Sequence, residues 1–568
     1  MTGRPESRRS ASDIAASKAF KQQLDKVYLW YTGGFALFVV SLAVAEQMGL
    51  PRDWIGFIFL LATIGLYAGI GIMSRTTDAT EYYVAGRRVP AVYNGMATGA
   101  DWMSAASFIG MAGTLYLTGY SGLAFIMGWT GGYCLVALLL APYLRKFGQF
   151  TIPDFLGERY GGNLPRLLGI AAAILCSFTY VVAQISGVGL ITSRLTGVAF
   201  ELGIFLGLGG ILVCSFLGGM RAVTWTQVAQ YIVLIVAYML PVVWLSVKQT
   251  GVPVPQAIYG FQLEKVTAKE KLLANDPKEL AVREIYKARS IELAAKLENP
   301  AAALVAAKAA AEAKLAGLRS ANAPSAQISA AEKALSALPR DAASARVTWS
   351  RAKAEADTKS LPLNGMPAHA AQFAGDPDGD TEARQTYDDS RRNFLALIFC
   401  LMVGTAALPH ILMRYYTVPS VREARESVAW SLLFIAILYL SAPALAVLVK
   451  FEVMNNLVGS QFAELPSWLA QWSRVDSALV EVSDINLDGI LQFGELKLGA
   501  DMVMLASPEL AGLPYVISGL VAAGGFAAAL STADGLLLTI SNAFVHDMRL
   551  GNKNGVETAE GRVILSKF

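Results

Sequence analysis

The apolar segment 513–546 contains the polar side chains that are most suited to binding an ion. It is long enough to cross a bilayer, yet it contains the adjacent hydroxyls Ser531 and Thr532 and the carboxylate Asp534. An ionisable group inside a membrane helix is costly, so it usually faces a partner, an ion or a water-filled path. Ala528 shares a helical face with the hydroxyls, and oxygen ligands are what a hard cation such as Na⁺ prefers. A stripe of small residues that packs against another helix is the alternative interpretation.

A second polar interruption lies in the apolar segment 93–117, where Gly, Thr, Asp and Ser break the run and Asp101 places a charge. Discontinuous membrane helices free backbone carbonyls that can coordinate ions. A break here would turn the carbonyls of Ala100 and Met103 toward the hydroxyls of the first segment. The predicted Na⁺ ligands are the carbonyls of Ala100, Met103 and Ala528 and the hydroxyls of Ser531 and Thr532.

Other polar residues on apolar segments could contact a substrate or support the ion site. In the segment 168–193, Tyr180 and Gln184 belong to a polar stripe at helical spacing, which could hydrogen-bond a small carboxylate or join two helices. The full set of candidates is Asp101, Trp102, Ser104, Tyr180, Gln184, Thr405 and Asp534. No Lys or Arg is expected in the middle of a span, so helix amino termini and the bound cation would attract an anion. This favours a monocarboxylate over a dicarboxylate.

These residues must be positioned by membrane helices. Hydrophobic residues make up 54% of the chain and charged residues 16%, and the mean hydropathy is +0.45, which indicates an all-α polytopic membrane protein. A spanning helix needs about 20 mostly apolar residues. The candidate spans are 29–49, 54–73, 93–117, 121–142, 168–193, 200–219, 225–247, 393–413, 428–450 and 513–546.

The distribution of Lys and Arg predicts the orientation of these spans. If the amino terminus is cytoplasmic, the inside segments hold nearly all the basic residues, while the short outside loops carry only Arg52 and Arg194. The positive-inside rule then places both termini in the cytoplasm of a multi-pass protein of a bacterial-type inner membrane, surrounded by lipid. The net charge of +3 is mostly explained by this asymmetry, so nothing favours nucleic-acid binding.

Two long segments leave the membrane in this topology. The segment 248–392 is rich in Ala, Lys and Glu, which are strong helix formers, and prolines divide it into two to four expected helices. Its apolar residues are mostly alanine, so a spacer and an arm that docks a partner are equally compatible with it. The partner would be an extracytoplasmic protein or a small membrane subunit.

The second of these segments, 451–512, contains a match to the calcium loop of an EF-hand at 484–495. Oxygen-bearing side chains stand at positions 1, 3 and 5, Gly489 at position 6 and a glutamate at position 12. The predicted Ca²⁺ ligands are Asp484, Asn486, Asp488, Ile490, Gln492 and Glu495. An acidic surface turn and a decayed loop are the alternatives, and a bound ion would be structural.

Three stretches together resemble the sodium/solute symporter family. They are the broken helix 100–104, the helix 528–532, and the segment 218–227 with its Gly-Gly-x-x-Ala-Val-x-Trp-Thr pattern. The stretches 404–410 and 531–535 resemble the acetate-permease branch, the cation/acetate symporters. The resemblance covers about 54–249 and 393–547. It implies an inverted-repeat, five-plus-five-helix (LeuT-type) fold with alternating access and Na⁺ as the coupling ion.

Several features depart from that family pattern. The chain is expected to lack the family's last core helices, which leaves the second repeat incomplete. Gln227 stands where many relatives have an aspartate, so a second coupled ion at that position is not expected. Proline carriers place a carboxylate where Trp102 stands, and Asp101 precedes it by one residue. Proline is therefore a poor substrate candidate.

The expected organisation follows from these spans and inserts. It is a cytoplasmic tail (1–27), two amino-terminal helices (28–75), the first five-helix repeat (93–247), the extracytoplasmic helical insert (248–392), the sixth and seventh core helices (393–450), the extracytoplasmic loop (451–512), the eighth core helix (513–547) and a cytoplasmic segment (548–568).

The functional prediction is cation-coupled symport of a small monocarboxylate such as acetate, propionate or pyruvate. A membrane sensor that reports an external ligand, and a symporter for another small solute, are the alternatives. An enzyme is not expected, because the chain has only three histidines and none belongs to a catalytic motif.

Overall fold

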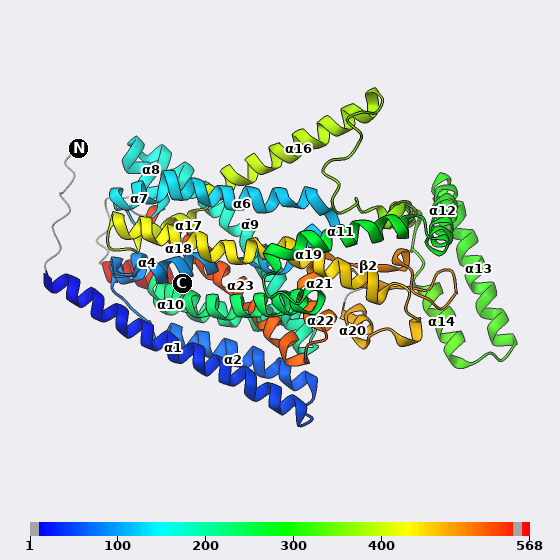
Figure 1. The fold of residues 1–568 in the computed structure, drawn as a ribbon, viewed down its shortest axis with the longest axis horizontal. Coiled ribbons are helices and arrows are strands. Elements are labelled where there is room, and N and C mark those ends of the chain that lie inside the picture. The colour runs from blue at the N-terminus through cyan, green and yellow to red at the C-terminus, as the bar shows by residue number, and fades with distance from the viewer. Residues whose placement is uncertain (1–10, 476–477, 549–558, 568) are drawn as a thin grey trace.

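The structure is a computed structural model that describes residues 11–475, 478–548 and 559–567. Most of these residues form an elongated bundle of long helices, and smaller helices gather at one end of it (Figure 1). Seven helices in the described residues are long and apolar enough to cross a membrane. An eighth span results if the bent pair Thr381–Ala406 and Pro409–Tyr416, with 44° between its parts, is counted as one.

The bundle is built from two series of helices that the insert separates. The first series is α1 (Ala11–Gln47), α2 (Arg52–Met73), α3 (Ala79–Val84), α4 (Ala91–Trp102), α5 (Met111–Thr118), α6 (Leu123–Leu135), α7 (Ala141–Phe147), α8 (Ile152–Tyr160), α9 (Asn163–Thr196) and α10 (Phe200–Thr250). The second series is α16 (Thr381–Ala406), α17 (Pro409–Met413), α18 (Val421–Tyr439), α19 (Ser441–Glu452), α23 (Tyr515–Asn542) and α25 (Ala559–Lys567).

Local sequence explains where the long helices bend. The expected spans 200–219 and 225–247 both lie within α10, which bends at Gly219, where φ is 54° and ψ is −144°. Only glycine adopts such a conformation without strain, and Tyr82 fills the space where a side chain would project. The expected spans 93–117 and 121–142 lie in the run from α4 to α7, which is interrupted after Trp102 and again at Gly119.

Helix α23 is the central element of the bundle and packs against α2, α4, α9 and α10. Of its most apolar window, 94% is buried, far more than in any other candidate span of the described residues. Its alanines and glycines permit close approach: a Cβ added at Gly524 would lie 2.4 Å from the Cβ of Ala237 on α10. The helix that carries Ser531 and Thr532 is therefore enclosed by protein rather than by lipid.

The insert forms five helices, where the sequence suggested two to four. They are α11 (Pro255–Ala274), α12 (Pro277–Glu298), α13 (Pro300–Ser320), α14 (Ser325–Ser336) and α15 (Ala342–Lys359). Helix α11 packs along α19, whereas α12, α13 and α14 project beyond the bundle (Figure 1). A small core of Leu293, Leu304, Ala345 and Trp349 joins α12, α13 and α15.

A buried ionic cluster anchors the insert to the bundle. Lys450 Nζ of α19, fully buried, lies 3.1 Å from Glu270 Oε1 of α11. The backbone N–H of His369 donates to both oxygens of Glu270, at 3.2 and 3.0 Å. Burial and then the charge of Lys450 lower the pKa of His369 to about 3, so its ring is neutral. Helix α11 and the segment around His369 are therefore fastened to the end of a core helix.

The second extramembrane segment folds against the insert. It contains η8 (Phe462–Glu464), α20 (Ser467–Val475), the antiparallel strands β1 (Val480–Val482) and β2 (Leu496–Leu498), η9 (Phe493–Glu495), α21 (Ala500–Leu505) and α22 (Ser507–Ala511). The carboxylate of Glu279 on α12 accepts hydrogen bonds from the backbone N–H groups of Phe493 and Gly494, at 2.5 and 3.0 Å. Both insertions thus form one cap at the same end of the bundle.

Candidate functional site

The helix break predicted near Asp101 is present. Helix α4 ends at Trp102, and Met103 leaves helical geometry with φ −81° and ψ 74°. The chain resumes as the π-helical turn η2 (Ala106–Gly110). The amide of Ala105, freed by the break, donates to Gln184 Oε1 of α9 at 2.9 Å. Gln184, predicted to contact substrate or support the ion site, therefore holds the broken helix in place.

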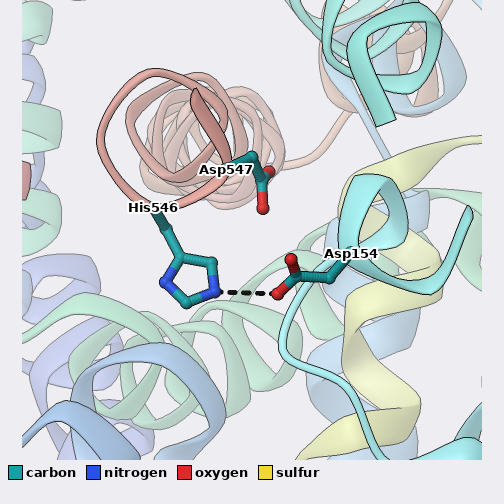
Figure 2. A group of neighbouring side chains, drawn as sticks. All are labelled: Asp154, His546 and Asp547. Carbon is teal, nitrogen blue, oxygen red and sulfur yellow. Dashed lines mark hydrogen bonds and ion pairs between the residues drawn. The ribbon is translucent and has the colours of Figure 1, made fainter. Parts of the chain in front are cut away.

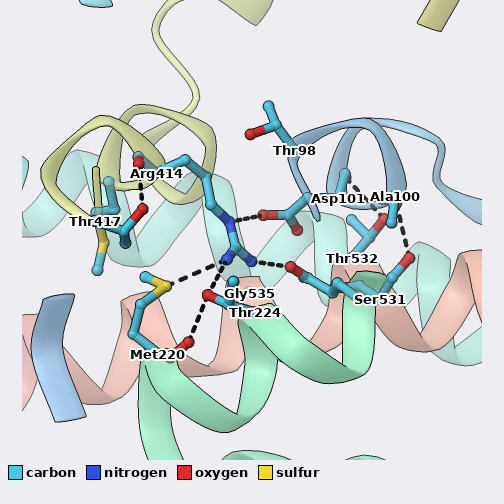
Figure 3. A network of polar contacts seen from close by, with 12 residues as sticks. Thr98, Ala100, Asp101, Met220, Thr224, Arg414, Thr417, Ser531, Thr532 and Gly535 are labelled. Carbon is cyan, nitrogen blue, oxygen red and sulfur yellow. Dashed lines mark hydrogen bonds and ion pairs between the residues drawn. The ribbon is translucent and has the colours of Figure 1, made fainter. Parts of the chain in front are cut away.

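Oxygen atoms of α4 and α23 converge beside this break. Ser531 Oγ donates to the carbonyls of Ala100 and Ala528, at 2.8 and 2.9 Å. Thr532 Oγ1 donates to the carbonyl of Asp101 at 3.0 Å and to that of Ala528 at 3.3 Å. Figure 3 shows both hydroxyls of α23 facing the end of α4. The structure thus brings together every predicted Na⁺ ligand except Met103.

Met103 is fully buried at the break itself. No hydrogen bond joins it to the two hydroxyls within the part of the chain that the structure describes. The shared group of Ala100, Ala528, Ser531 and Thr532, which we call the oxygen cluster, contains only carbonyl and hydroxyl oxygens. Such a donor set suits a hard cation and offers nothing to a soft one.

A buried arginine that the sequence analysis missed stands next to the oxygen cluster. Arg414 begins the turn η6 (Arg414–Tyr416), and its Nε lies 3.0 Å from Asp101 Oδ2, with both side chains fully buried. We expected no Lys or Arg in the middle of a span. The bend between α16 and α17 carries Arg414 into the bundle, where its charge pairs with Asp101 at the end of α4.

The guanidinium of Arg414 also binds α10. It donates to Thr224 Oγ1 at 3.0 Å and to Gln227 Oε1, and it contacts Met220 Sδ at 3.4 Å. Figure 3 shows Arg414 between Asp101 on one side and Met220 and Thr224 on the other. Gln227 Nε2 in turn donates to the carbonyl of Ser531 at 2.7 Å. Arg414 therefore links α4 to α10, and Gln227 links α10 to α23 beside the oxygen cluster.

Close packing fixes the carboxylate of Asp101. A Cβ added at Gly535 of α23 would lie 2.6 Å from Asp101 Oδ1, so any larger residue there would displace this carboxylate. Asp534, predicted to contact a substrate or support the ion site, is buried on the same helix and does not line the cavity described next.

A cavity of about 190 Å³ opens on the other side of Asp101. Five of its lining residues were predicted as candidates for substrate contact: Asp101, Trp102, Ser104, Tyr180 and Thr405. Sequence analysis had not assigned the remainder, which are Ala106, Ser107, Trp129, Leu408, His410, Ile411 and Tyr439. Ser107 Oγ and Tyr439 OH lie 3.0 Å apart. The cavity combines aromatic walls with hydroxyl and imidazole groups, as small-molecule sites commonly do.

The loop 484–495 lies between the strands β1 and β2, whereas an EF-hand loop joins two helices. Gly489 has φ +73°, and its N–H donates to Asp484 Oδ2 at 3.0 Å. Glu495 folds back, and its carboxylate accepts from the amides of Ile485 and Gln492 at 2.7 and 3.1 Å. Burial raises the pKa of Glu495, although these amides act in the opposite direction.

The other predicted ligands of this loop lie around the same turn. Asn486 Oδ1 accepts from the amide of Asp488 at 3.1 Å, Asp488 Oδ1 accepts from the amide of Ile490 at 2.8 Å, and Gln492 Nε2 donates to Asp488 Oδ2 at 3.0 Å. Asp488 also pairs with Lys278 of the insert at 3.4 Å. The loop is therefore closed on itself by its own side chains.

A further acidic group lies at the end of the bundle away from the insert. Asp154 of α8, with His546 and Asp547 of η10 (Ala543–Asp547), places three ligand atoms within 4.8 Å of one another (Figure 2). His546 Nε2 lies 2.8 Å from Asp154 Oδ2, and Thr151 donates to Asp547 at 2.6 Å. Arg166 lies 3.4 Å from Asp154. Because protein groups already engage these oxygens, the group joins α8 to η10.

Known proteins resemble this chain in sequence. A model described as the sodium:solute symporter family matches residues 82–296. An uncharacterized symporter of Cupriavidus necator is 52% identical over 540 residues, which is 94% of this chain and 78% of the relative. A monocarboxylic acid transporter of Corynebacterium glutamicum is 24% identical over 540 residues, covering 93% of this chain and 72% of that protein.

A solved structure shares the fold. It is the substrate-bound, outward-open state of a Na⁺-coupled sialic acid symporter, with a TM-score of 0.51 and 15% identity over 90% of this chain and 77% of that one. This likeness confirms the predicted all-α symporter architecture. The family is shown by the relative that is 52% identical, together with the matching family model. The chain belongs to the sodium:solute symporter family.

Proposed function

We propose that this protein carries a small monocarboxylate, such as acetate, propionate or pyruvate, into the cell together with Na⁺ by alternating access. Its family is one of transporters rather than enzymes, and solute transport with Na⁺ is the activity that membership implies. The finer assignment of the substrate rests on the cavity beside Asp101. The name of the related monocarboxylic acid transporter points in the same direction.

The size of the cavity supports a small solute. Pockets for drug-sized ligands measure roughly 300–1,000 Å³, whereas this cavity measures about 190 Å³. Trp102, Trp129 and Tyr439 would surround a short apolar tail, while the hydroxyls of Tyr180 and Thr405 could donate to a carboxylate. The negative charge of Asp101 would repel an anion, but Arg414 neutralises it at 3.0 Å.

In this proposal the oxygen cluster is the Na⁺ site. Ala100, Ala528, Ser531 and Thr532 would supply the ligands once the two hydroxyls turn their lone pairs toward the ion, with the carbonyl of Met103 as a further ligand at the break. The site adjoins Asp101, which lines the cavity, so cation and substrate would bind on opposite sides of one broken helix. Binding of one would then favour the helix position that suits the other.

Uptake of short carboxylates into proteoliposomes tests this function. With an inward Na⁺ gradient we expect saturable accumulation of labelled acetate, propionate or pyruvate, and little accumulation when choline replaces Na⁺. Removing one donor by Tyr180→Phe should raise KM about tenfold, the effect of one lost hydrogen bond of roughly 1.4 kcal/mol.

The matched control is Thr179→Val, because Thr179 is exposed on the same helix and its hydroxyl donates to the carbonyl of Leu175 within that helix. Its KM should equal that of the unaltered protein. Na⁺-dependent uptake of another solute class, with no uptake of any short monocarboxylate, would exclude the proposed substrate.

We also propose that the loop 484–495 binds a structural Ca²⁺. Among the residues that the structure describes, Asp484 Oδ1 is buried and has no hydrogen-bond partner, which leaves an oxygen for a cation at position 1 of the loop. The remaining ligands would be Asn486, Asp488, Gln492, Glu495 and the carbonyl of Ile490. Leu491 exchanges backbone hydrogen bonds with Gly459 and Ser460, at 2.8 Å each. The segment 459–460 therefore contacts the loop at the place where a second EF-hand would otherwise pair with it.

Ca²⁺ at about 100 times its Kd should stabilise the purified protein by about 2.7 kcal/mol, seen as a rise in Tm. Glu495→Gln should remove that rise, because position 12 supplies the bidentate ligand. Glu481→Gln on β1, which changes a carboxylate outside the loop, should retain it. An equal rise in Tm for both variants, or none for the unaltered protein, would contradict the Ca²⁺ assignment.

A further inference from the structure

Arg414 is a permanent positive charge at the centre of the transport machinery. Its side chain is fully buried, and a buried guanidinium persists only when its donors are paired. Its partners come from two helices: Asp101 on α4, and Thr224 and Gln227 on α10. This charge belongs to the protein itself rather than to a bound ion.

The partners of Arg414 have the chemistry of a cation site. A carboxylate oxygen, a hydroxyl oxygen and an amide oxygen converge on the guanidinium, and these are the ligand types that hard cations take. The guanidinium occupies the space that they enclose (Figure 3). A mobile cation could bind these same oxygens only if Arg414 left them.

This group adjoins the oxygen cluster on two sides. Gln227 donates to the carbonyl of Ser531 at 2.7 Å, and the carbonyl of Asp101 accepts from Thr532 at 3.0 Å. Two cations in neighbouring oxygen cages repel each other strongly inside a protein. Asp101 neutralises Arg414 at 3.0 Å, so the oxygen cluster can still bind one Na⁺, whereas a second Na⁺ would have no carboxylate to offset its repulsion.

We propose that the guanidinium of Arg414 is a resident cation that takes the place of a second transported Na⁺, so that one Na⁺ moves with one monocarboxylate and no net charge crosses the membrane. This inference rests on the proposed function. The oxygen cluster binds the transported ion, while Arg414 balances Asp101 in every state. The amide at Gln227 is part of the same arrangement, because a carboxylate there would add a second negative charge around the guanidinium.

The unaltered protein in proteoliposomes provides the decisive measurement. The dependence of initial uptake on Na⁺ should have a Hill coefficient of about one, because that coefficient cannot exceed the number of coupled sites. A K⁺ diffusion potential set with valinomycin should not alter accumulation. For each net charge carried, a potential of 100 mV would change the equilibrium accumulation ratio about 50-fold.

The possible outcomes separate the two proposals. Uptake that needs Na⁺ but follows the membrane potential, or that has a Hill coefficient of about two, overturns the inference about Arg414 and leaves the proposed function standing. Carboxylate uptake that is indifferent to Na⁺ overturns the proposed function itself.

A variant protein tests the role of Arg414 directly. Combining Arg414→Gln with Gln227→Asp removes the fixed charge and offers a carboxylate to a mobile cation in the same space. The Hill coefficient should rise toward about two, and accumulation should become sensitive to potential. A folded double variant that keeps a coefficient of about one and no response to potential overturns the inference. Should this variant not assemble, the measurements on the unaltered protein still decide the question.

Discussion

Replacing Ser531 and Thr532 together by alanine should abolish Na⁺-driven uptake at ordinary Na⁺ concentrations. Each hydroxyl is a ligand of the proposed Na⁺ site, and an interaction between a polar group and a charge is worth about 1.5–3 kcal/mol. Losing both should weaken Na⁺ binding by about 3–6 kcal/mol, which raises the half-saturating Na⁺ concentration at least 100-fold. Initial uptake rates over a wide range of Na⁺ concentrations measure this change.

The variant should still fold, because alanine is the best helix former and both positions lie in the middle of α23. Thr539→Ala is the matched control. Thr539 is a buried threonine of the same helix, and its hydroxyl bonds to the carbonyl of Gly535 within that helix. The control should keep the Na⁺ dependence of the unaltered protein. A double variant with unaltered half-saturation would show that Na⁺ binds elsewhere.

The helix pair that forms the oxygen cluster could be predicted because its signal is local. Gly, Thr and Ser inside an apolar run mark both a weak helix and a close approach of two helices, so α4 and α23 were expected to meet. The break after Trp102 and the contacts of Ser531 and Thr532 agree with that expectation. The family resemblance added the pairing, which no periodicity within either segment specifies.

Arg414 escaped prediction because its position depends on tertiary structure. Hydropathy ends the span near residue 413, so a charge directly after it is interpreted as an interfacial residue. The 44° bend between α16 and α17 returns the chain to the bundle and buries Arg414 completely. Its partner Asp101 precedes it by 313 positions. The lone charge at Asp101 was the only available signal, since a buried carboxylate needs a partner.

The same limit explains the insert. Alanine, lysine and glutamate predicted that the insert is helical, because helix propensity is local, but the structure has five helices rather than two to four. Its attachment to the core was not predicted, since it depends on Lys450 meeting Glu270, 180 positions away, and on Glu279 meeting the backbone near Phe493. A composition dominated by alanine was equally compatible with a spacer and with an arm that docks a partner, and it gave no sign that buried polar contacts fasten the base of the insert to α19.

Breaking the ion pair of Asp101 and Arg414 should be the most destabilising single change in the transport core. Arg414→Met leaves Asp101 with an uncompensated charge in a fully buried position. Removing one partner of a buried pair costs about 3–5 kcal/mol, because the remaining charge cannot be solvated. We expect a large fall in Tm for the purified protein in detergent, together with loss of uptake.

Two comparisons separate the charge from the loss of packing. Asp101→Asn combined with Arg414→Met removes both charges and should recover most of the stability, because a buried pair is worth little against neutral residues of similar volume. Arg422→Gln removes an equally short but exposed pair, in which Nε lies 2.9 Å from Glu426 Oε1 and Arg422 is 88% exposed. That change should cost at most about 1 kcal/mol. If the double variant were as unstable as Arg414→Met alone, the charge of the arginine would not be what stabilises the core. Its volume and its hydrogen bonds to α10 would then account for the lost stability. If Arg414→Met lowered the stability as little as Arg422→Gln, Asp101 would have to be neutral in the folded protein. The charge of Arg414 beside the oxygen cluster would then not depend on a charged carboxylate at Asp101.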